Sequence, residues 1–384
     1  MRRVEIRSKS ALEIVYRGHM NQYDGTTIRK VIHELVDSPS PYDALAALDE
    51  QPATPTDLAD RGVAARSTSH KWLDILLGRS WVRRRDNGQY ELTEGGTLVF
   101  RECNNCFEII GRETLASLSD SVYTVQSLRA LDSDPVLPTA TEGDDSSPSS
   151  STRTRVRTLF EEHEWIAPER GGYRVTTGGK RARGAYIGLC EIIELVEDTR
   201  PFLKLFRGKI SPPRSVLDRS SLIGVDASRK VMGEPLSEFT DPISTDLDRF
   251  RGVVPTVNPA YIQEFRPLLG SDVQMEIVTD RTVLKSAQLG YMDVLRDSFA
   301  AANLDMYITL SDISTGVAIF DDSRAQVGVY DDNYLHHASL DGTDDDVVDW
   351  GVDLYEAYWD DAWHIPNLAS LKNVSAKMAD VMSG

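Results

Sequence analysis

The sequence is poor in cysteine and has no long hydrophobic run. Three cysteines in 384 residues cannot form a disulfide framework, which favours a reducing cytoplasm. No apolar run approaches the roughly 18 residues of a membrane span. The first residues, Met1 to Glu5, are not followed by the apolar segment that a secretion signal contains. These absences predict a cytoplasmic protein with no membrane contact.

The charge is strongly acidic and unevenly distributed. The chain has 42 basic and 60 acidic residues, a net charge of −18, and lysine is scarce at 10 residues against 32 arginines. Residues 241–384 alone hold 9 basic and 25 acidic residues. Such a surface suggests adaptation to a salty cytoplasm, where screening weakens repulsion between like charges. Two windows run against this trend, because Arg61–Arg85 and Thr152–Arg183 are locally basic and favour phosphate binding.

An internal repeat with a shift of 83 residues organises the first half of the chain. The shift superimposes hydrophobic, turn and glycine positions without a gap, and it ends by placing Gly95-Gly96 on Gly178-Gly179. A constant offset over all three residue classes predicts two copies of one small unit, followed by a different domain.

The first copy, residues 41–100, has the element order of a winged helix-turn-helix. Thr54 caps a short helix that begins with Pro55. A second helix over residues 65–77 carries an apolar stripe, and two strands joined by Asn87-Gly88 follow it as a hairpin. In this class the last helix enters the major groove of DNA while the hairpin, or wing, lies against phosphate.

Polar residues of the last helix and wing are therefore the candidate DNA contacts. For base edges and phosphates these are Arg66, Ser67, Thr68, His70 and Lys71, and for wing phosphates Arg83, Arg84 and Arg85. The alternative is a winged helix that contacts only protein, and the sequence leaves both open.

The second copy, residues 122–180, is degenerate. Residues 141–151 read as a loop where the first copy has its short helix. The next helix, over residues 151–163, begins with Arg153 and Arg155, which are further DNA-binding candidates. Whether this copy contacts DNA or is only a spacer stays open.

The remaining segments complete the predicted organisation. Residues 1–40 are an N-terminal extension, and residues 101–121 and 181–207 are linker helices of the kind that form dimer interfaces. The first linker contains Cys103 and Cys106, which on a helix are more simply two half-buried thiols than a metal site. Residues 208–384 alternate strands and helices, among them a helix over residues 280–299, then form a meander and close with a helix over about residues 345–363, which predicts an acidic α/β domain.

Motifs of the C-terminal part resemble a known group. Arg249 to Pro255 before Asn258-Pro259, Gly316 to Phe320, and Asp349 to Trp359 resemble archaeal, and by composition haloarchaeal, regulators of the methanogenesis-regulator and TrmB-like type. The resemblance implies a winged helix joined to an effector domain, which is similar to a phospholipase-D-like fold that has lost its chemistry. One departure is that relatives usually carry one winged helix, whereas this chain carries two copies.

Enzyme motifs are missing from the sequence. None of the seven histidines precedes a lysine by two residues, as a phospholipase-D site requires, and adjacent His336 and His337 would point to opposite faces of a strand. We therefore predict an α+β protein that is not an enzyme, with no catalytic residue, no cofactor and no metal. It would be a homodimeric DNA-binding transcriptional regulator, with double-stranded DNA and a small-molecule effector as partners. The alternative is a winged-helix protein–protein adaptor without DNA contact.

Overall fold

The computed structural model describes residues 25–37, 39–131, 149–170, 172–224, 242–257 and 259–367. The chain divides into two compact units, one up to Asp198 and one from Thr199, and each is described by itself. Within the described residues, no helix is both long and apolar enough to cross a bilayer.

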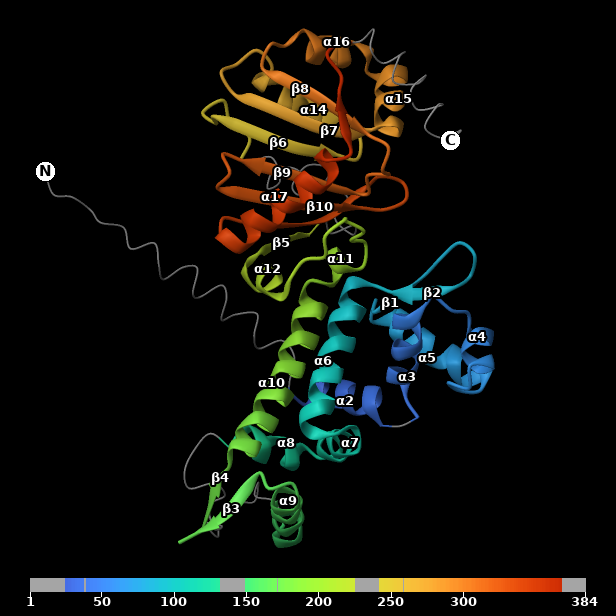
Figure 1. Ribbon diagram of the computed structural model, residues 1–384, viewed down its shortest axis with the longest axis vertical. Coiled ribbons are helices and arrows are strands. Elements are labelled where there is room, and N and C mark those ends of the chain that lie inside the picture. Colours follow the sequence, from blue (N-terminus) through green and yellow to red (C-terminus); the bar gives the residue numbers. More distant parts are fainter. Residues whose placement is uncertain are drawn as a thin grey trace, which may run out of the picture. The chain divides into compact units, whose positions relative to one another are not determined.

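The first unit is mainly helical (Figure 1). Its elements are α2 (Gly25–Val36), α3 (Pro41–Glu50), α4 (Pro55–Asp60), α5 (Arg66–Gly78), β1 (Val82–Arg84), β2 (Tyr90–Leu92), α6 (Glu94–Ile110), α7 (Arg112–Asp120), α8 (Val122–Arg129), α9 (Ser150–Glu162), β3 (Ile166–Glu169), β4 (Gly172–Val175) and α10 (Thr177–Asp198). Two short antiparallel hairpins, β1–β2 and β3–β4, are its strands among these residues.

Part of the predicted N-terminal extension belongs to the core. Residues 25–36 form α2, whose side chains Ile28, Ile32 and Leu35 are almost completely buried. No helix is predicted for this stretch from the sequence, because residues 1–40 are assigned only as an N-terminal extension that precedes the repeat. The packed unit therefore begins before residue 41.

The 83-residue shift is visible in the structure. It carries α2 onto α7, α3 onto α8, α5 onto α9, each hairpin onto the other, and α6 onto α10. The junction after each hairpin is also the same: Thr93 and Thr176 accept hydrogen bonds from the N–H of Gly96 and Gly179, which caps the start of α6 and α10. The counterpart of α4 lies outside the described residues.

Both predicted linker helices are interrupted. The segment 101–121 contains the end of α6 and all of α7, with Gly111 between them at φ +86°, a conformation that favours glycine. The segment 181–207 contains the end of α10 and, after Thr199, the short α11 (Arg200–Leu203). By the repeat, α7 is the first helix of the second copy rather than a linker.

The second unit contains one mixed sheet of eight strands. In sheet order these are β12 (Ala362–His364), β8 (Leu304–Thr309), β7 (Gln274–Asp280), β6 (Arg249–Val254), β9 (Thr315–Phe320), β10 (Arg324–Tyr330), β11 (His336–Gly342) and β5 (Ser221–Gly224). Strands β6, β7 and β8 are parallel and the other pairs are antiparallel. Its helices are α11, α12 (Arg214–Arg219), α14 (Pro259–Phe265), the 3-10 turn η1 (Arg266–Leu268), α15 (Arg281–Gly290), α16 (Met292–Ala300) and α17 (Asp345–Trp359).

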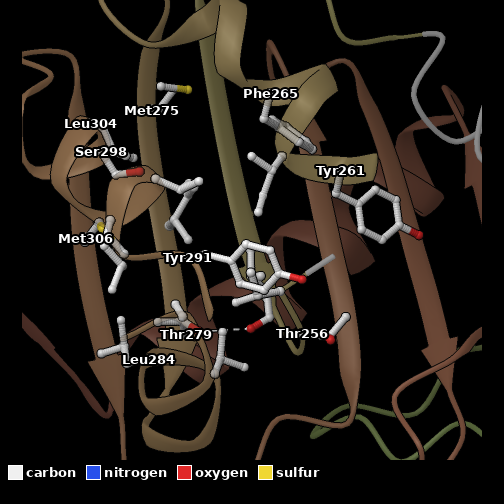
Figure 2. Close-up of a pocket in the computed structure, with 18 of the residues that line it drawn as sticks. Thr256, Tyr261, Phe265, Met275, Thr279, Leu284, Tyr291, Ser298, Leu304 and Met306 are labelled. Atoms are coloured by element: carbon white, nitrogen blue, oxygen red, sulfur yellow. Dashed lines mark hydrogen bonds between the residues drawn. The ribbon is translucent and has the colours of Figure 1, made fainter. Parts of the chain in front are cut away.

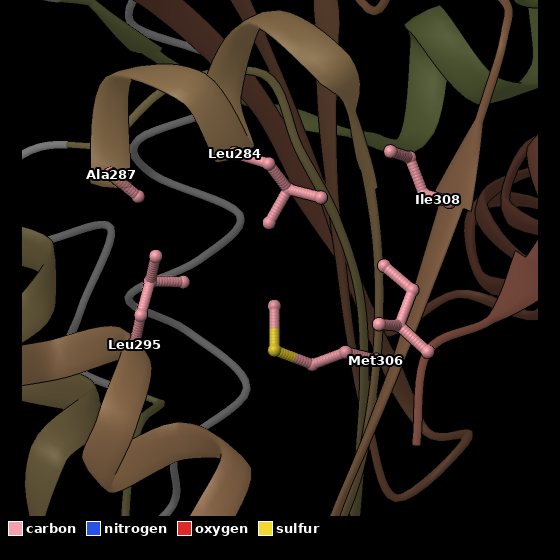
Figure 3. Packing of buried hydrophobic residues seen from close by; sticks show 6 residues of the cluster. Leu284, Ala287, Leu295, Met306 and Ile308 are labelled. Atoms are coloured by element: carbon pink, nitrogen blue, oxygen red, sulfur yellow. The ribbon is translucent and has the colours of Figure 1, made fainter. Parts of the chain in front are cut away.

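Side-chain alternation places helices on both faces of this sheet. On one face, Glu276 of β7 accepts a hydrogen bond from Tyr355 of α17 at 3.2 Å. On the other face, Met306 of β8 packs with Leu284 and Ala287 of α15 and Leu295 of α16 (Figure 3). The mixed α+β class is confirmed for the described residues.

Two helices and three strands of the second unit differ from the sequence prediction. The helix predicted over residues 280–299 is two helices, because the backbone leaves helical geometry at Tyr291 (φ −140°, ψ 43°). The C-terminal helix ends at Trp359 rather than Trp363, and β12 follows it. Strands β5, β11 and β12 were not predicted, since each is short or lacks an apolar alternation.

Candidate nucleic-acid interface and ligand cavity

Helix α5 has one buried and one solvent-facing side. Ser69, Trp72, Leu73 and Leu76 are buried, as the predicted apolar stripe requires. These residues hold α5 against α3 and α4, so that the opposite side faces outward.

The candidate DNA contacts of α5 lie on its outward side. Arg66, Ser67, His70 and Lys71 are exposed, and Thr68 is half-buried. Positions three and four apart share a helix face, so Arg66 and His70, and Ser67 and Lys71, lie one above the other. Within the described residues, neither Arg66 nor Lys71 has a carboxylate partner. Both cations are therefore available to an anion.

The start of α5 adds partial positive charge to this face. Its N-cap is Ala65, which has no side-chain acceptor to satisfy the first N–H groups. Thr68 and Ser69 donate their N–H groups to the carbonyl of Ala65 at 2.8 and 2.9 Å, whereas the N–H groups of Arg66 and Ser67 have no acceptor within the described residues. Uncapped N–H groups at a helix start attract phosphate oxygens.

The wing is less cationic than its three arginines suggest. Glu91 of β2 lies opposite Arg83 of β1 in the hairpin register and accepts its Nε–H at 2.6 Å; it also accepts from Arg85. Burial opposes ionisation of Glu91, but the hydrogen bonds from Arg85 and Arg83 outweigh it and lower the pKa of this carboxyl. Arg84 is exposed and has no such partner among the described residues, which leaves it as the wing cation best placed for phosphate.

Sequence reasoning missed Glu91, although a signal for it existed. A two-residue turn at Asn87-Gly88 would pair residue 91 with residue 84, whereas the observed register is centred on Asn87 and pairs Glu91 with Arg83; either register places Glu91 across from an arginine. An opposite charge at that cross-strand position predicts an ion pair.

The second copy presents a similar helix start. Arg153 and Arg155 are exposed on α9, and Val156 and Phe160 face the core. Here Ser149 caps the helix by accepting the N–H of Thr152 at 3.2 Å. The equivalent N–H in α5, that of Thr68, is donated to the Ala65 carbonyl, so the two helix starts differ in whether a side chain or the backbone accepts this bond.

The thiols lie in the contact between α6 and α10. Cys103 and Cys106 of α6 and Cys190 of α10 are all buried, rather than half-buried as predicted, because these two helices pack along their length (Figure 1). Burial raises the pKa of Cys106 to about 12, and it raises the pKa of Cys103 as well. Both thiols are therefore protonated at neutral pH. Within the described residues, no group of three metal-ligating side chains lies together.

A cavity of about 190 Å³ opens in the second unit between the sheet and helices α14 to α16 (Figure 2). Its floor is formed by residues of β6, β7, β8 and β9, and its lining is mostly hydrocarbon. In Figure 2 the ring of Tyr291 lies between Met306 and Leu284 on one side and Thr256 and Tyr261 on the other. No sequence prediction named this cavity, because its walls come from segments far apart in the chain.

A buried polar group borders one wall of the cavity. Tyr261 Oη lies 3.1 Å from Nδ1 of His336, whose Nε2 lies 2.8 Å from the hydroxyl of Ser339. Burial lowers the pKa of His336 to about 4, so this ring is neutral. His337 instead contacts Asp331 at 3.1 Å, and the two histidines diverge as their strand position predicts.

Each of the two units contains a match to a known protein-domain family. Residues 232–361 match the middle domain of the methanogenesis regulatory protein FilR1, and residues 29–114 match the HVO_A0261 N-terminal domain. The first match spans most of the sheet and the cavity, and the second spans α5 and the wing. Among curated proteins, none matches the sequence.

Solved structures give only distant likenesses. TrmBL2, an archaeal chromatin protein, is 12% identical with a TM-score of 0.28, over 87% of this chain and 98% of that one. NucT from Helicobacter pylori is 14% identical with a TM-score of 0.30, over 38% and 99%. The phospholipase D family member Nuc from Salmonella typhimurium is 10% identical with a TM-score of 0.30, over 38% and 97%. TM-scores this low support no conclusion about the function of this chain.

The class follows from the two family matches. Residues 232–361 are similar to a domain of a methanogenesis regulatory protein, and this confirms the resemblance to the methanogenesis-regulator type.

Proposed function

We propose that this protein is a DNA-binding transcriptional regulator, in which the first copy of the repeat is a winged helix-turn-helix. The observation that carries the proposal is the outward face of α5. It presents Arg66, Ser67, His70 and Lys71 to solvent, and within the described residues no carboxylate neutralises its two permanent cations. The FilR1 and HVO_A0261 domain matches support the same function.

In this proposal, the tip of α5 enters the major groove. Arginine and lysine read guanine edges or contact phosphate, and the hydroxyls of Ser67 and Thr68 accept or donate at either. Arg84 lies on the flanking backbone, while Arg83 and Arg85 are held by Glu91 and contribute less. Arg153 and Arg155 of the second copy are secondary contacts.

The second unit acts as the effector unit, without catalysis. None of the histidines has the lysine two residues later that phospholipase-D chemistry needs, and the cavity offers a place for a small molecule. A homodimer would bind two half-sites of the DNA. The contacts at the second half-site would offset the affinity that is lost in a salty cytoplasm, where counterion release contributes little.

The proposal is tested with the full chain and fragmented genomic DNA. Purified protein is expected to enrich a small set of related sequences, and its affinity for them is expected to fall as salt concentration rises, because phosphate contacts release counterions. Enrichment of no sequence, with protein association that persists or strengthens in high salt, would instead identify an adaptor that docks through apolar surface.

A further inference from the structure

The cavity of the second unit has almost no capacity to hold charge. Among its described lining residues the only charged side chains are Arg266 and Asp297. Their Nη2 and Oδ2 atoms are 2.8 Å apart, and both side chains are about half exposed to solvent at the rim. A charged ligand inside would lose its hydration with no opposite charge to replace it, which is strongly unfavourable.

The interior is built from hydrocarbon. Leu284, Ala287, Leu295 and Met306 point toward a common space between α15, α16 and β8 (Figure 3). Phe250 and Met275 of the sheet extend the same surface. Contact with such a lining favours a ligand that is itself mainly hydrocarbon.

A few hydroxyls interrupt this lining, and three of them have no hydrogen-bond partner within the described residues. The hydroxyl of Thr279 donates to the carbonyl of Val254 at 3.1 Å, and Tyr261 is engaged with His336. Thr256, Tyr291 and Ser298 also line the cavity, and within the described residues their hydroxyls have no hydrogen-bond partner; Thr256 and Tyr291 lie on the same side of the cavity, and Ser298 lies beside Leu304 (Figure 2). Each can serve one polar atom of a ligand.

The volume sets the size of the ligand. A cavity of about 150 Å³ lined by leucine, isoleucine and phenylalanine is known to bind benzene, and the cavity here has about 190 Å³. One aromatic ring with substituents, or two fused rings, fits that space.

We propose that this cavity binds a neutral, mainly hydrocarbon molecule of one or two rings that carries a single hydroxyl or carbonyl group. The polar group is placed beside Thr256 and Tyr291 and the rings lie against Ala287 and Met306. This assignment rests on the proposed role of the second unit as the effector unit, and it names the chemical class of that effector. Sugars and phosphorylated metabolites are excluded by the same lining, because their polar groups would find too few partners.

The test compares two probes on the full chain by isothermal titration and fluorescence. 2-Naphthol is neutral at pH 7, and 2-naphthoate has the same rings with a carboxylate. We expect saturable, one-site binding of 2-naphthol and binding of 2-naphthoate that is at least about tenfold weaker. No saturable binding of 2-naphthol, or equal binding of both probes, would overturn the proposal.

Matched variants locate the bound probe. Ala287→Phe fills the space between α15 and β8 and is expected to abolish 2-naphthol binding, whereas Leu289→Phe on the same helix, at a side chain 82% exposed, is expected to leave it unchanged. Thr256→Val keeps the volume and removes one hydroxyl, so affinity is expected to fall about two- to tenfold. Unchanged binding in both Ala287→Phe and Thr256→Val would place the probe elsewhere and contradict the assignment.

DNA binding of the same variants is measured in parallel. Loss of probe binding in a variant that still binds DNA leaves the regulator function standing and concerns the ligand alone. If the wild-type chain binds 2-naphthol but no DNA, the proposed function fails while the ligand assignment holds. Should Ala287→Phe fail to fold, Thr256→Val and the pair of probes still decide the question.

Discussion

The two copies of the repeat share their framework and differ at their helix starts. In both, a threonine caps the helix after the hairpin and a glycine packs against the carbonyl of a tryptophan, Trp81 or Trp165. At the outward tip, α5 is uncapped whereas Ser149 caps α9. The packed junction is therefore retained in both copies, while the surface chemistry has diverged. Under the proposed function, the two copies are therefore expected to contribute unequally to DNA binding.

The shared junction predicts the largest effects. A Cβ on Gly96 or Gly179 would lie closer to the carbonyl of Trp81 or Trp165 than real Cβ atoms come, and backbone cannot yield cheaply. Gly96→Ala and Gly179→Ala are each expected to lower the free energy of unfolding by about 3 kcal/mol. Denaturant unfolding monitored by circular dichroism measures it.

Gly184 supplies the matched control. It lies in the same helix as Gly179, and nothing lies within 4 Å of its added Cβ. Gly184→Ala is therefore expected to be neutral or to stabilise by about 0.5–1 kcal/mol. A junction that tolerates alanine in one copy only would break the equivalence of the two copies.

The helix starts predict the next largest effect, on DNA affinity. Arg66→Ala with Lys71→Ala is expected to weaken binding by about 2–3 kcal/mol, or about thirty- to 150-fold, since the proposed function places both groups on base edges or phosphate. Arg153→Ala with Arg155→Ala removes the same charge from the second copy and is expected to weaken binding less than tenfold. Fluorescence anisotropy with one labelled duplex compares the pairs; equal losses would show that both copies bind alike.

An ion pair joins the copies and predicts a pH dependence. Arg112 of α7 donates to both carboxylate oxygens of Asp43 in α3, at 2.6 and 2.9 Å. Burial opposes ionisation of Asp43, but hydrogen bonds from Arg112 and the N–H of Ser40 outweigh it and lower its pKa. The pair thus stabilises the fold above the unfolded pKa of about 3.9, and this contribution is lost as pH falls through the lower folded value.

Arg112→Ala is expected to destabilise by about 2 kcal/mol at pH 7, and the difference from wild type is expected to shrink as the medium is acidified toward protonation of Asp43. Urea unfolding over a pH series measures it. Arg214→Ala, which breaks an exposed pair with Asp218, is the control and should change stability by less than about 0.5 kcal/mol. A difference independent of pH would remove Asp43 from the explanation.

Substitutions in the wing are expected to have the smallest effects on DNA affinity, and one of them is expected to raise it. Glu91→Gln releases Arg83 and Arg85 from their carboxylate, so DNA affinity is expected to rise about threefold and the salt dependence to steepen. Arg84→Ala is expected to weaken binding by a similar factor. Affinity that falls in Glu91→Gln would mean that the ion pairs position the wing.

The sequence predicted the parts of this fold that are governed by local patterns. The repeat, the apolar stripe of α5 and the Asn87-Gly88 hairpin follow from spacing and turn chemistry. Strand β11 did not, because His336-His337-Ala338-Ser339 lacks alternation and its pairing partners β10 and β5 lie on either side only after folding. The cavity could not be predicted either, because an apolar strand in a filled core and an apolar strand beside a cavity have the same sequence pattern.

The central claim is that the tip of α5 lies on DNA, and cross-linking tests it most directly. A photoreactive benzoylphenylalanine at Ser67 is expected to cross-link the full chain to a bound duplex, whereas the same group at exposed Glu108 of α6 is expected not to. Cross-links from position 67 to protein alone, with bound DNA present, would contradict the claim.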